Sequence, residues 1–292
     1  MGLPEREHTV TQAEAGRTVK HLALRVMGLS ESMFSSLKFS GGIWVDGHPA
    51  RANERLETGQ TLKCRWEEKG RQCPEAYDLS LSIPYEDDHY LIIDKPAPLP
   101  VLSSARQQGP TVENALYGQM GRPENYLFRP VNRLDKGTSG LMTAALDANA
   151  QYLLQRQLHS PSFVREYMAL CRGALPDREG TIALPIAQRE NSVKREIRPD
   201  GLKAVTHYRV EAAGERGTLV RLRLETGRTH QIRVHLAALG CPIAGDYLYG
   251  TEDAAFPGRF ALHSCRVCFL HPFTGEQVEV QSPFPESWKT ML

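Results

Sequence analysis

The sequence predicts an α+β protein in which a small α+β domain precedes a larger domain with a mixed, largely antiparallel sheet. Beyond residue 73, helices and strands mix without the regular βαβ alternation of a parallel sheet. A polar stretch at residues 67–75 has the composition of a linker. The 292 residues, 41% of them hydrophobic, suffice for one or two domains. We expect the domains to span residues 1–72 and 73–292.

The first domain is expected to hold two small helices and a few short strands. One helix covers the stretch after Gly16, and a second begins at Ser30 and ends at residues 40–42, since glycine commonly follows a helix. The expected strands and turns, in order, are strand 43–45, turn 46–47, turn 58–59 and strand 61–66. So few short elements predict a small satellite domain, while the main hydrophobic core belongs to the second domain.

The second domain begins with a strand at residues 90–95, which ends at the proline-rich stretch 96–100 because neither a helix nor a central strand accommodates it. The other elements expected there are a helix from Thr111, a strand at 164–170, a helix with Thr229 as N-cap and Gly240 after its end, and a strand at 260–270.

Charge and composition exclude several classes of protein. No run approaches the roughly 18 apolar residues of a membrane span, and the polar first residues lack a secretory signal, so we expect a cytosolic protein. The net charge is +1, yet residues 189–233 hold eleven basic and six acidic residues. Such a segment could follow a phosphate backbone or form a solvated strand face, and charge alone leaves both readings open.

The six cysteines show no disulfide framework. Cys265 and Cys268 form a single CxxC, with His263 and His271 nearby. We expect no metal there, because the pair lies in a strand, where positions three apart point to opposite faces.

Three segments could carry chemistry. The loop at residues 133–140 places Asp135 beside Arg133 and Lys136, whose charges favour an ionised carboxylate. Such a group could be a nucleophile, a base or a metal ligand, or it could cap the turn. In the second segment, Arg233 lies in the first turn of a helix, where a guanidinium requires a nearby anion.

In the same helix, His230 and His235 are five residues apart, which does not suit a shared metal ion. The third segment is the strand at residues 164–170, where alternation puts Tyr167 on one face with Arg165 and Ala169. Tyr167 could be a core residue or a platform on which a base stacks.

Together the three segments resemble the RluA family of RNA pseudouridine synthases. The resemblance rests on Arg-Leu-Asp-Lys-Gly-Thr-Ser-Gly at 133–140 and Gly-Arg-Thr-His-Gln-Ile-Arg-Val-His at 227–235, and it covers about residue 79 to the C-terminus. Further agreement lies at 93–96, 242–246, 249–250, 261–264 and 271–272. The first domain is similar to the small S-four-like RNA-binding domain that often precedes this catalytic domain, through Ser-Gly-Gly-Ile-Trp-Val-Asp-Gly at 40–47.

The resemblance implies a catalytic domain of the pseudouridine synthase type and a role for each matching residue. Asp135 would be the catalytic aspartate, Arg233 its partner, and Tyr167 a residue that stacks on the target uracil and assists catalysis. The implied substrate-binding residues are Leu262, Arg133, Thr138, Arg228 and His230. The reaction breaks the N-glycosidic bond of uridine, rotates the uracil and rejoins it through carbon, so no cofactor or metal is expected.

The expected partner is RNA, with ribosomal RNA ahead of transfer RNA, and we expect a monomer with no membrane association. Two other functions stay open. One is a non-catalytic RNA-binding or ribosome-assembly protein with the same fold. The other is a carboxylate hydrolase, for which Asp246 or Asp94 would have to supply a second acid near Asp135.

The chain departs from the family pattern at three places. Asn132 stands where the family usually has histidine, and we expect it to alter loop packing or substrate preference. Leu102 and Ser103 replace a usual His-Pro pair, and Met33 stands where a basic residue is common in the first domain.

Overall fold

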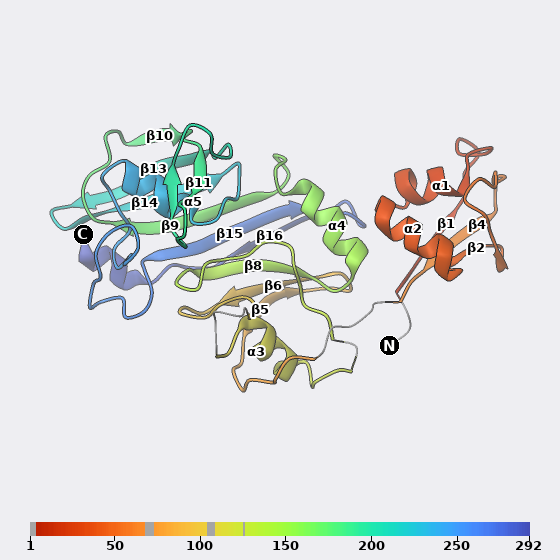
Figure 1. Cartoon of the computed structure of the whole chain (residues 1–292), viewed down its shortest axis with the longest axis horizontal. Helices are drawn as coiled ribbons and strands as arrows, with labels where there is room; N and C mark the ends of the chain where they lie inside the picture. The colour runs from red at the N-terminus through yellow and green to blue at the C-terminus, as the bar shows by residue number, and fades with distance from the viewer. Residues whose placement is uncertain (1–3, 68–72, 104–108, 125) are drawn as a thin grey trace.

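The computed structural model describes residues 4–67, 73–103, 109–124 and 126–292. Two sheets organise the chain (Figure 1). A four-stranded sheet belongs to the N-terminal part, and a ten-stranded sheet belongs to the rest. The α+β class with a largely antiparallel main sheet is therefore confirmed. Of the predicted linker, residues 68–72 lie outside the described residues, and so does the last residue of the predicted first domain.

The small sheet has the strand order β1-β4-β2-β3 and packs against short helices. Its elements are β1 (Glu5–Thr9), α1 (Val19–His21), the π-helix η1 (Leu22–Val26), α2 (Glu31–Ser40), β2 (Ile43–Val45), β3 (His48–Pro49) and β4 (Thr61–Arg65). As predicted, α2 starts after Ser30, whose hydroxyl accepts a hydrogen bond from Met33 N, and ends at Gly41 with φ 74°. Phe34 and Leu37 of α2 enter a core separate from that of the large sheet.

The large sheet has the order β10-β13-β14-β9-β15-β8-β6-β5, with β16 paired to β15 and β7 to β8. Its strands are β5 (Ser82–Glu86), β6 (Tyr90–Lys95), β7 (Arg129–Pro130), β8 (Ser139–Ala145), β9 (Val164–Cys171), β10 (Glu179–Ile182), β13 (Thr206–Gly214), β14 (Gly217–Leu224), β15 (Leu262–Leu270) and β16 (Gln277–Gln281). The remaining elements of this part are α3 (Val112–Gln119), α4 (Ala148–Gln157), the hairpin β11 (Ile186–Gln188) and β12 (Arg195–Ile197), α5 (Gln231–Ala238) and the 3₁₀-helix η2 (Glu286–Met291).

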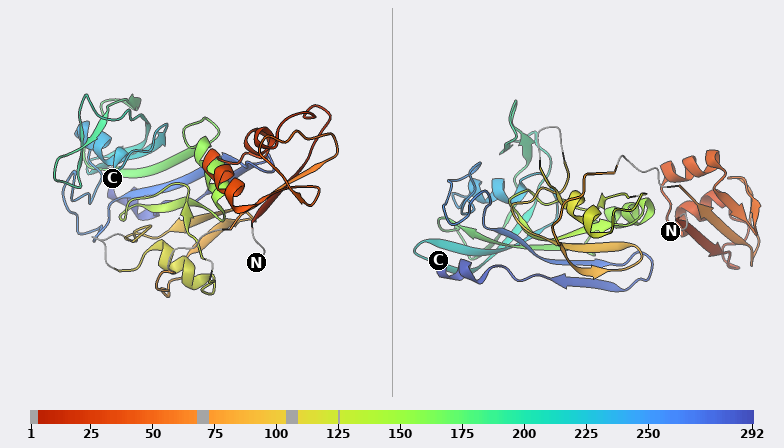
Figure 2. Two further views of the ribbon diagram at one scale, coloured as in Figure 1. Left: turned by 45° about the vertical axis from the view of Figure 1, so that its right-hand side comes forward. Right: turned by 90° about the horizontal axis from the view of Figure 1, so that it is seen from below.

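The N-terminal unit lies beyond the α4 end of the large sheet, and the two views of Figure 2 agree on this placement. Direct contacts join the two parts, among them Gly28 against the Leu153 side chain of α4. The Arg6 guanidinium of β1 lies over the Phe273 ring, 3.4 Å from its centroid. A groove of about 1110 Å³ runs between α2 and α4. No helix among the described residues is long and apolar enough to cross a membrane.

The pair β8–β15 is parallel, unlike the other strand pairs recorded for this sheet, and it joins His263 to Ser139 and Ser264 to Gly140. Gly140 has φ 99°, and a Cβ there would lie 2.3 Å from the carbonyl oxygen of Ser264. A side chain is therefore excluded twice, by the backbone conformation and by the neighbouring strand. This close approach sets where the loop before β8 stands against β15.

We predict that Gly140→Ala lowers the free energy of unfolding by about 3 kcal/mol, because it adds strain and a backbone clash. Urea denaturation measures the change. The matched control is Gly121→Ala, since Gly121 also has positive φ but open space at its Cβ, and it should cost only about 1 kcal/mol. Equal losses in the two variants would contradict the proposed role of the β8–β15 contact.

Candidate active site

The loop between β7 and β8 presents the carboxylate of Asp135. The main-chain oxygen of Asp135 accepts a hydrogen bond from Thr138 N at 3.1 Å, which closes a tight turn. The next residue, Lys136, accepts one from Leu99 N at 3.0 Å, which fixes the loop to the segment after β6. The side chain of Asp135 keeps 26% of its surface exposed, so the carboxylate is held in place yet open to a cavity.

Arg233 lies in the first turn of α5, as predicted, and the anion that its position requires is present. Its Nη1 donates to Asp135 Oδ2 at 3.1 Å. Its other two nitrogens donate to a second carboxylate, Nε to Asp246 Oδ2 at 2.7 Å and Nη2 to Asp246 Oδ1 at 2.8 Å. Burial by itself would lower the pKa of Arg233, but the two carboxylates outweigh burial and raise it.

Asp246 holds the guanidinium from the side away from the cavity. It is fully buried, and its Oδ1 also accepts from the backbone N–H groups of Leu248 and Tyr249 at 3.0 and 3.3 Å. Phe260 lies under the guanidinium, with its ring centroid 4.3 Å from Arg233 Cζ. Both oxygens of Asp246 are thus engaged with Arg233, and they are not free to act as a second acid. Asp94, the other candidate acid, accepts a hydrogen bond from Ser282 Oγ at 2.6 Å.

The start of α5 differs from the prediction in one respect. The N-cap is His230, with φ 58° and no capping hydrogen bond from its side chain, and not Thr229. The reason is that Gln231 holds the preceding turn instead. Its Oε1 accepts from Arg228 N at 3.0 Å, and its Nε2 donates to the Val205 carbonyl at 3.0 Å. At the other end of the helix, Gly240 follows with φ 73°, as predicted.

His230 faces the loop that carries Asp135. Its Nε2 lies 3.9 Å from Asp135 Oδ2, and its Nδ1 lies 2.8 Å from the hydroxyl of Tyr249. That hydroxyl accepts a hydrogen bond from Arg195 N at 2.7 Å, so its own proton is available for Nδ1. Burial lowers the pKa of His230 in spite of the nearby Asp135 charge. The ring is therefore neutral near pH 7, and the tautomer with its proton on Nε2 lets Nδ1 accept from the Tyr249 hydroxyl.

A cavity of about 530 Å³ collects the residues singled out in the sequence. All eight line it, and they are Asp135, Arg233, Tyr167, Leu262, Arg133, Thr138, Arg228 and His230. Tyr167 and Leu262 come from β9 and β15 and are buried. Burial raises the pKa of Tyr167, and the nearby Asp135 charge adds to the effect, so its phenol is protonated at neutral pH.

Asn132, the departure from the family pattern, is buried beside this loop and also lines the cavity. Its Oδ1 accepts from Thr143 N at 2.9 Å, and so ties the loop to β8. Arg228 is held by Nε donation to the Lys203 carbonyl at 3.0 Å. Among the described residues, no group of three or more His, Cys, Asp and Glu side chains could hold a metal ion, and Cys265 and Cys268 are both buried in β15.

Lys95 is a charged residue at this site to which the sequence reasoning gave no role. It is fully buried at the end of β6, and its Nζ donates to the carbonyls of Pro96, Leu99 and Lys136 at 3.0, 2.8 and 3.4 Å. Lys95 therefore supports the loop that carries Asp135 from the buried side of that loop, through the Lys136 carbonyl. Burial lowers the pKa of Lys95 to about 7, against the opposing charge of Asp135.

We predict that Lys95 makes stability rise with pH. Between about pH 7 and pH 10.5 the unfolded chain binds a proton on Lys95 that the folded chain releases, so the free energy of unfolding increases across this window. Urea denaturation at pH 7, 8, 9 and 10 should show this rise in the wild type and a smaller one in Lys95→Met. Lys289→Met, at an exposed lysine, should keep the wild-type slope. Equal slopes in all three proteins would contradict the prediction.

We also predict that the two carboxylates of Arg233 differ in their effect on stability. Asp246→Asn should lower the free energy of unfolding by about 3 kcal/mol or more, because the buried guanidinium of Arg233 loses its buried carboxylate partner. Asp135→Asn should change it by no more than about 1 kcal/mol, because Asp135 is partly exposed and Arg233 keeps Asp246. Urea denaturation of the two isosteric variants tests this, and a larger loss in Asp135→Asn would reverse the assignment.

Comparisons with known proteins show the family of the chain. Residues 89–238 match the family described as RNA pseudouridylate synthase. The chain is 37% identical to ribosomal large subunit pseudouridine synthase D of Xanthomonas campestris pv. campestris, over 98% of this chain and 91% of that protein. It is 36% identical to the uncharacterized RNA pseudouridine synthase YjbO of Bacillus subtilis, over 94% of this chain and 98% of that protein.

Among solved structures, human RNA pseudouridylate synthase domain containing 1 matches with a TM-score of 0.57 and 27% identity, over 75% of this chain and 90% of that one. The match in fold and the match in sequence thus point to the same family. The chain belongs to the RluA-type family of RNA pseudouridine synthases, enzymes that isomerise uridine in RNA.

Proposed function

We propose that Asp135 is the catalytic carboxylate with which this pseudouridine synthase converts specific uridines of ribosomal RNA. The observation that carries the proposal is the hydrogen bond from Arg233 to Asp135 at the wall of the cavity. Arg233 is itself held by the buried Asp246, so it offers Asp135 one N–H in a fixed direction. That bond holds the carboxylate in one position when substrate closes the cavity and excludes water.

The target uridine must leave its stack to reach this carboxylate, because Asp135 lies in a cavity and not on a flat surface. We assign Tyr167 and Leu262 to the two faces of the flipped uracil. Their burial in the cavity wall supports this, since an aromatic ring and an apolar side chain hold a base by stacking without reading its sequence. We assign substrate binding around the same cavity to four further lining residues: Arg133, Thr138, Arg228 and His230.

The reaction needs no atoms from outside the substrate. The bond from the ribose carbon to the uracil nitrogen breaks, the uracil rotates, and a bond from the ribose carbon to a ring carbon forms. That ring carbon gives up its proton, and the released ring nitrogen takes up a proton, so the overall composition is unchanged. Asp135 serves this exchange as a nucleophile or a base. The intact set of Asp135, Arg233 and Tyr167 in one cavity favours an enzyme over a non-catalytic RNA-binding protein.

Ribosomal RNA is proposed as the substrate because several relatives carry the name ribosomal large subunit pseudouridine synthase D. Action on that RNA would place the enzyme in the cytoplasm. We propose that the enzyme acts as a monomer.

We further assign residues 1–72 to RNA binding as an S-four-like domain, with the catalytic domain at residues 73–292. The support is the groove between α2 and α4, lined by Ser32, Ser36, Lys63 and Arg65 among others. Gln155 of α4 lines both this groove and the catalytic cavity, so one RNA strand could pass from one to the other.

We predict that Asp135→Asn lowers turnover by at least about 1,000-fold while the protein stays folded, because the amide can act neither as nucleophile nor as base. Carbodiimide labelling and reverse transcription of RNA from source cells with and without the gene would map the pseudouridines. Sites lost with the gene should return with the wild type and with the control Asp253→Asn, but not with Asp135→Asn. Restoration by Asp135→Asn would overturn the proposed mechanism.

A further inference from the structure

Arg165 of β9 is a buried cation in the wall of the catalytic cavity to which the proposed reaction gives no role. Only 5% of its surface is exposed, and it lines the cavity together with Tyr167, two positions along the same strand. Its Nη2 donates to the Leu158 carbonyl at 3.1 Å, and its Cζ lies 5.7 Å from the centroid of the Phe163 ring. Its Nε has no hydrogen-bond partner among the described residues.

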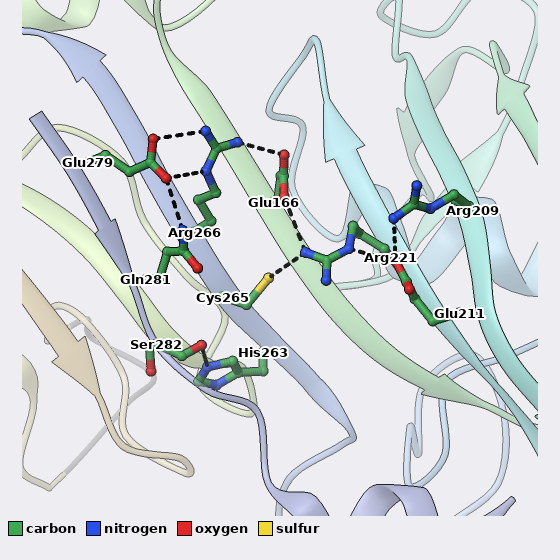
Figure 3. Close-up of polar contacts among 10 residues, drawn as sticks. All are labelled: Glu166, Arg209, Glu211, Arg221, His263, Cys265, Arg266, Glu279, Gln281 and Ser282. Atoms are coloured by element: carbon green, nitrogen blue, oxygen red, sulfur yellow. Dashed lines mark hydrogen bonds and ion pairs between the residues drawn. The ribbon is translucent and has the colours of Figure 1, made fainter. Parts of the chain in front are cut away.

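No carboxylate lies within ion-pair distance of Arg165 among the residues that the structure describes. On the opposite face of the same sheet, by contrast, the arginines have carboxylate partners (Figure 3). There Arg266 pairs with Glu166 and Glu279, and Arg221 pairs with Glu166 and Glu211. These arginines are more exposed than Arg165 and need counter-charges less. A buried guanidinium without an anion is costly, so its presence in the cavity indicates that an anion reaches it during function.

The position of the guanidinium defines where that anion would lie. Nη1 faces the loop between β14 and α5, since a Cβ added to Gly227 would lie 2.9 Å from it. Leu158, which binds Nη2, follows directly on α4. Arg165 therefore lies in the side wall of the cavity, between the end of α4 and the loop that leads to His230 and Arg233.

We propose that Arg165 binds the backbone phosphodiester next to the target uridine, and so holds the flipped nucleotide by its phosphate. This rests on the proposed function, because RNA brings one such anion with every nucleotide. The charge of Arg233 is already matched by Asp135 and Asp246. Arg133 and Lys136 are exposed and Arg228 is half-buried, so among the described residues of the cavity Arg165 is the most deeply buried cation without a carboxylate partner. A guanidinium fits a phosphate through two parallel N–H donors, an arrangement that an ammonium group does not reproduce.

The test compares Arg165→Met, Arg165→Lys and the wild type on a short RNA containing the target uridine. Loss of one charged contact should raise KM roughly 10- to 100-fold, with kcat nearly unchanged. The slope of log KM against log salt should become shallower by about 1. Arg165→Lys should recover only part of the affinity. The control Arg209→Met, an exposed arginine on the opposite face, should behave as the wild type.

A second arm identifies the phosphate. RNAs with a single uncharged methylphosphonate at each position around the uridine are assayed with wild type and Arg165→Met. One position should raise KM for the wild type but not for Arg165→Met, since the contact is then already lost. Gly227→Ala, which pushes against Nη1, should raise KM in the same way. This variant and the methylphosphonate series on the wild type suffice if Arg165→Met does not fold.

Two results would overturn the proposal. The first is a fall in kcat with unchanged KM and salt slope, which would make Arg165 a residue that positions Tyr167. The second is a methylphosphonate series in which no position distinguishes wild type from Arg165→Met. Neither result touches the proposed function, which fails instead if wild-type protein leaves every uridine unmodified.

Discussion

The fork of hydrogen bonds around Arg233 is the interaction on which the site depends. One guanidinium joins two carboxylates that lie 111 residues apart in the chain, Asp135 and Asp246, and its geometry fixes both. Three separate segments must meet for this to happen: the loop before β8, the first turn of α5 and the buried turn that carries Asp246. Lysine could not replace Arg233, because a single ammonium group does not present N–H donors in two opposed directions.

The charged residues in and around the cavity differ in how deeply they are buried. Asp246 is buried and compensated, and it serves only to hold Arg233. Asp135 is partly open and shares the same guanidinium, so its carboxylate is positioned without being shielded from substrate. Lys95 lies beneath the loop and binds carbonyl groups rather than a carboxylate. The Asp135 carboxylate is therefore the outermost member of a set whose inner members are fixed by hydrogen bonds.

Sequence reasoning succeeded where a motif is local and failed where a contact is distant. The loop around Asp135 and the helix with Arg233 in its first turn follow from glycine, proline and hydroxyl placement. Their meeting followed from family resemblance alone. Asp246 was considered only as a rival acid, because nothing in its own segment points to Arg233. The N-cap was misplaced at Thr229, since the side chain of Gln231 bonds to the preceding strands through contacts that spacing does not reveal. Arg165 was placed on the same strand face as Tyr167. That it has no carboxylate partner could not be predicted, because its neighbours come from segments distant in the sequence.

The parallel pair β8–β15 has a consequence for how the protein is made. Ser139 and His263 are hydrogen-bonded partners separated by 124 residues. At roughly 5–20 residues per second, a ribosome needs on the order of ten seconds between synthesising the first and the second. Until β15 has left the ribosome, the loop that carries Asp135 is held only by its contacts to β6, β8 and the segment after β6, and Leu262 is missing from the cavity. The nascent chain can thus fold its small N-terminal sheet early, while the pairing of β8 with β15 waits until 124 further residues have been synthesised.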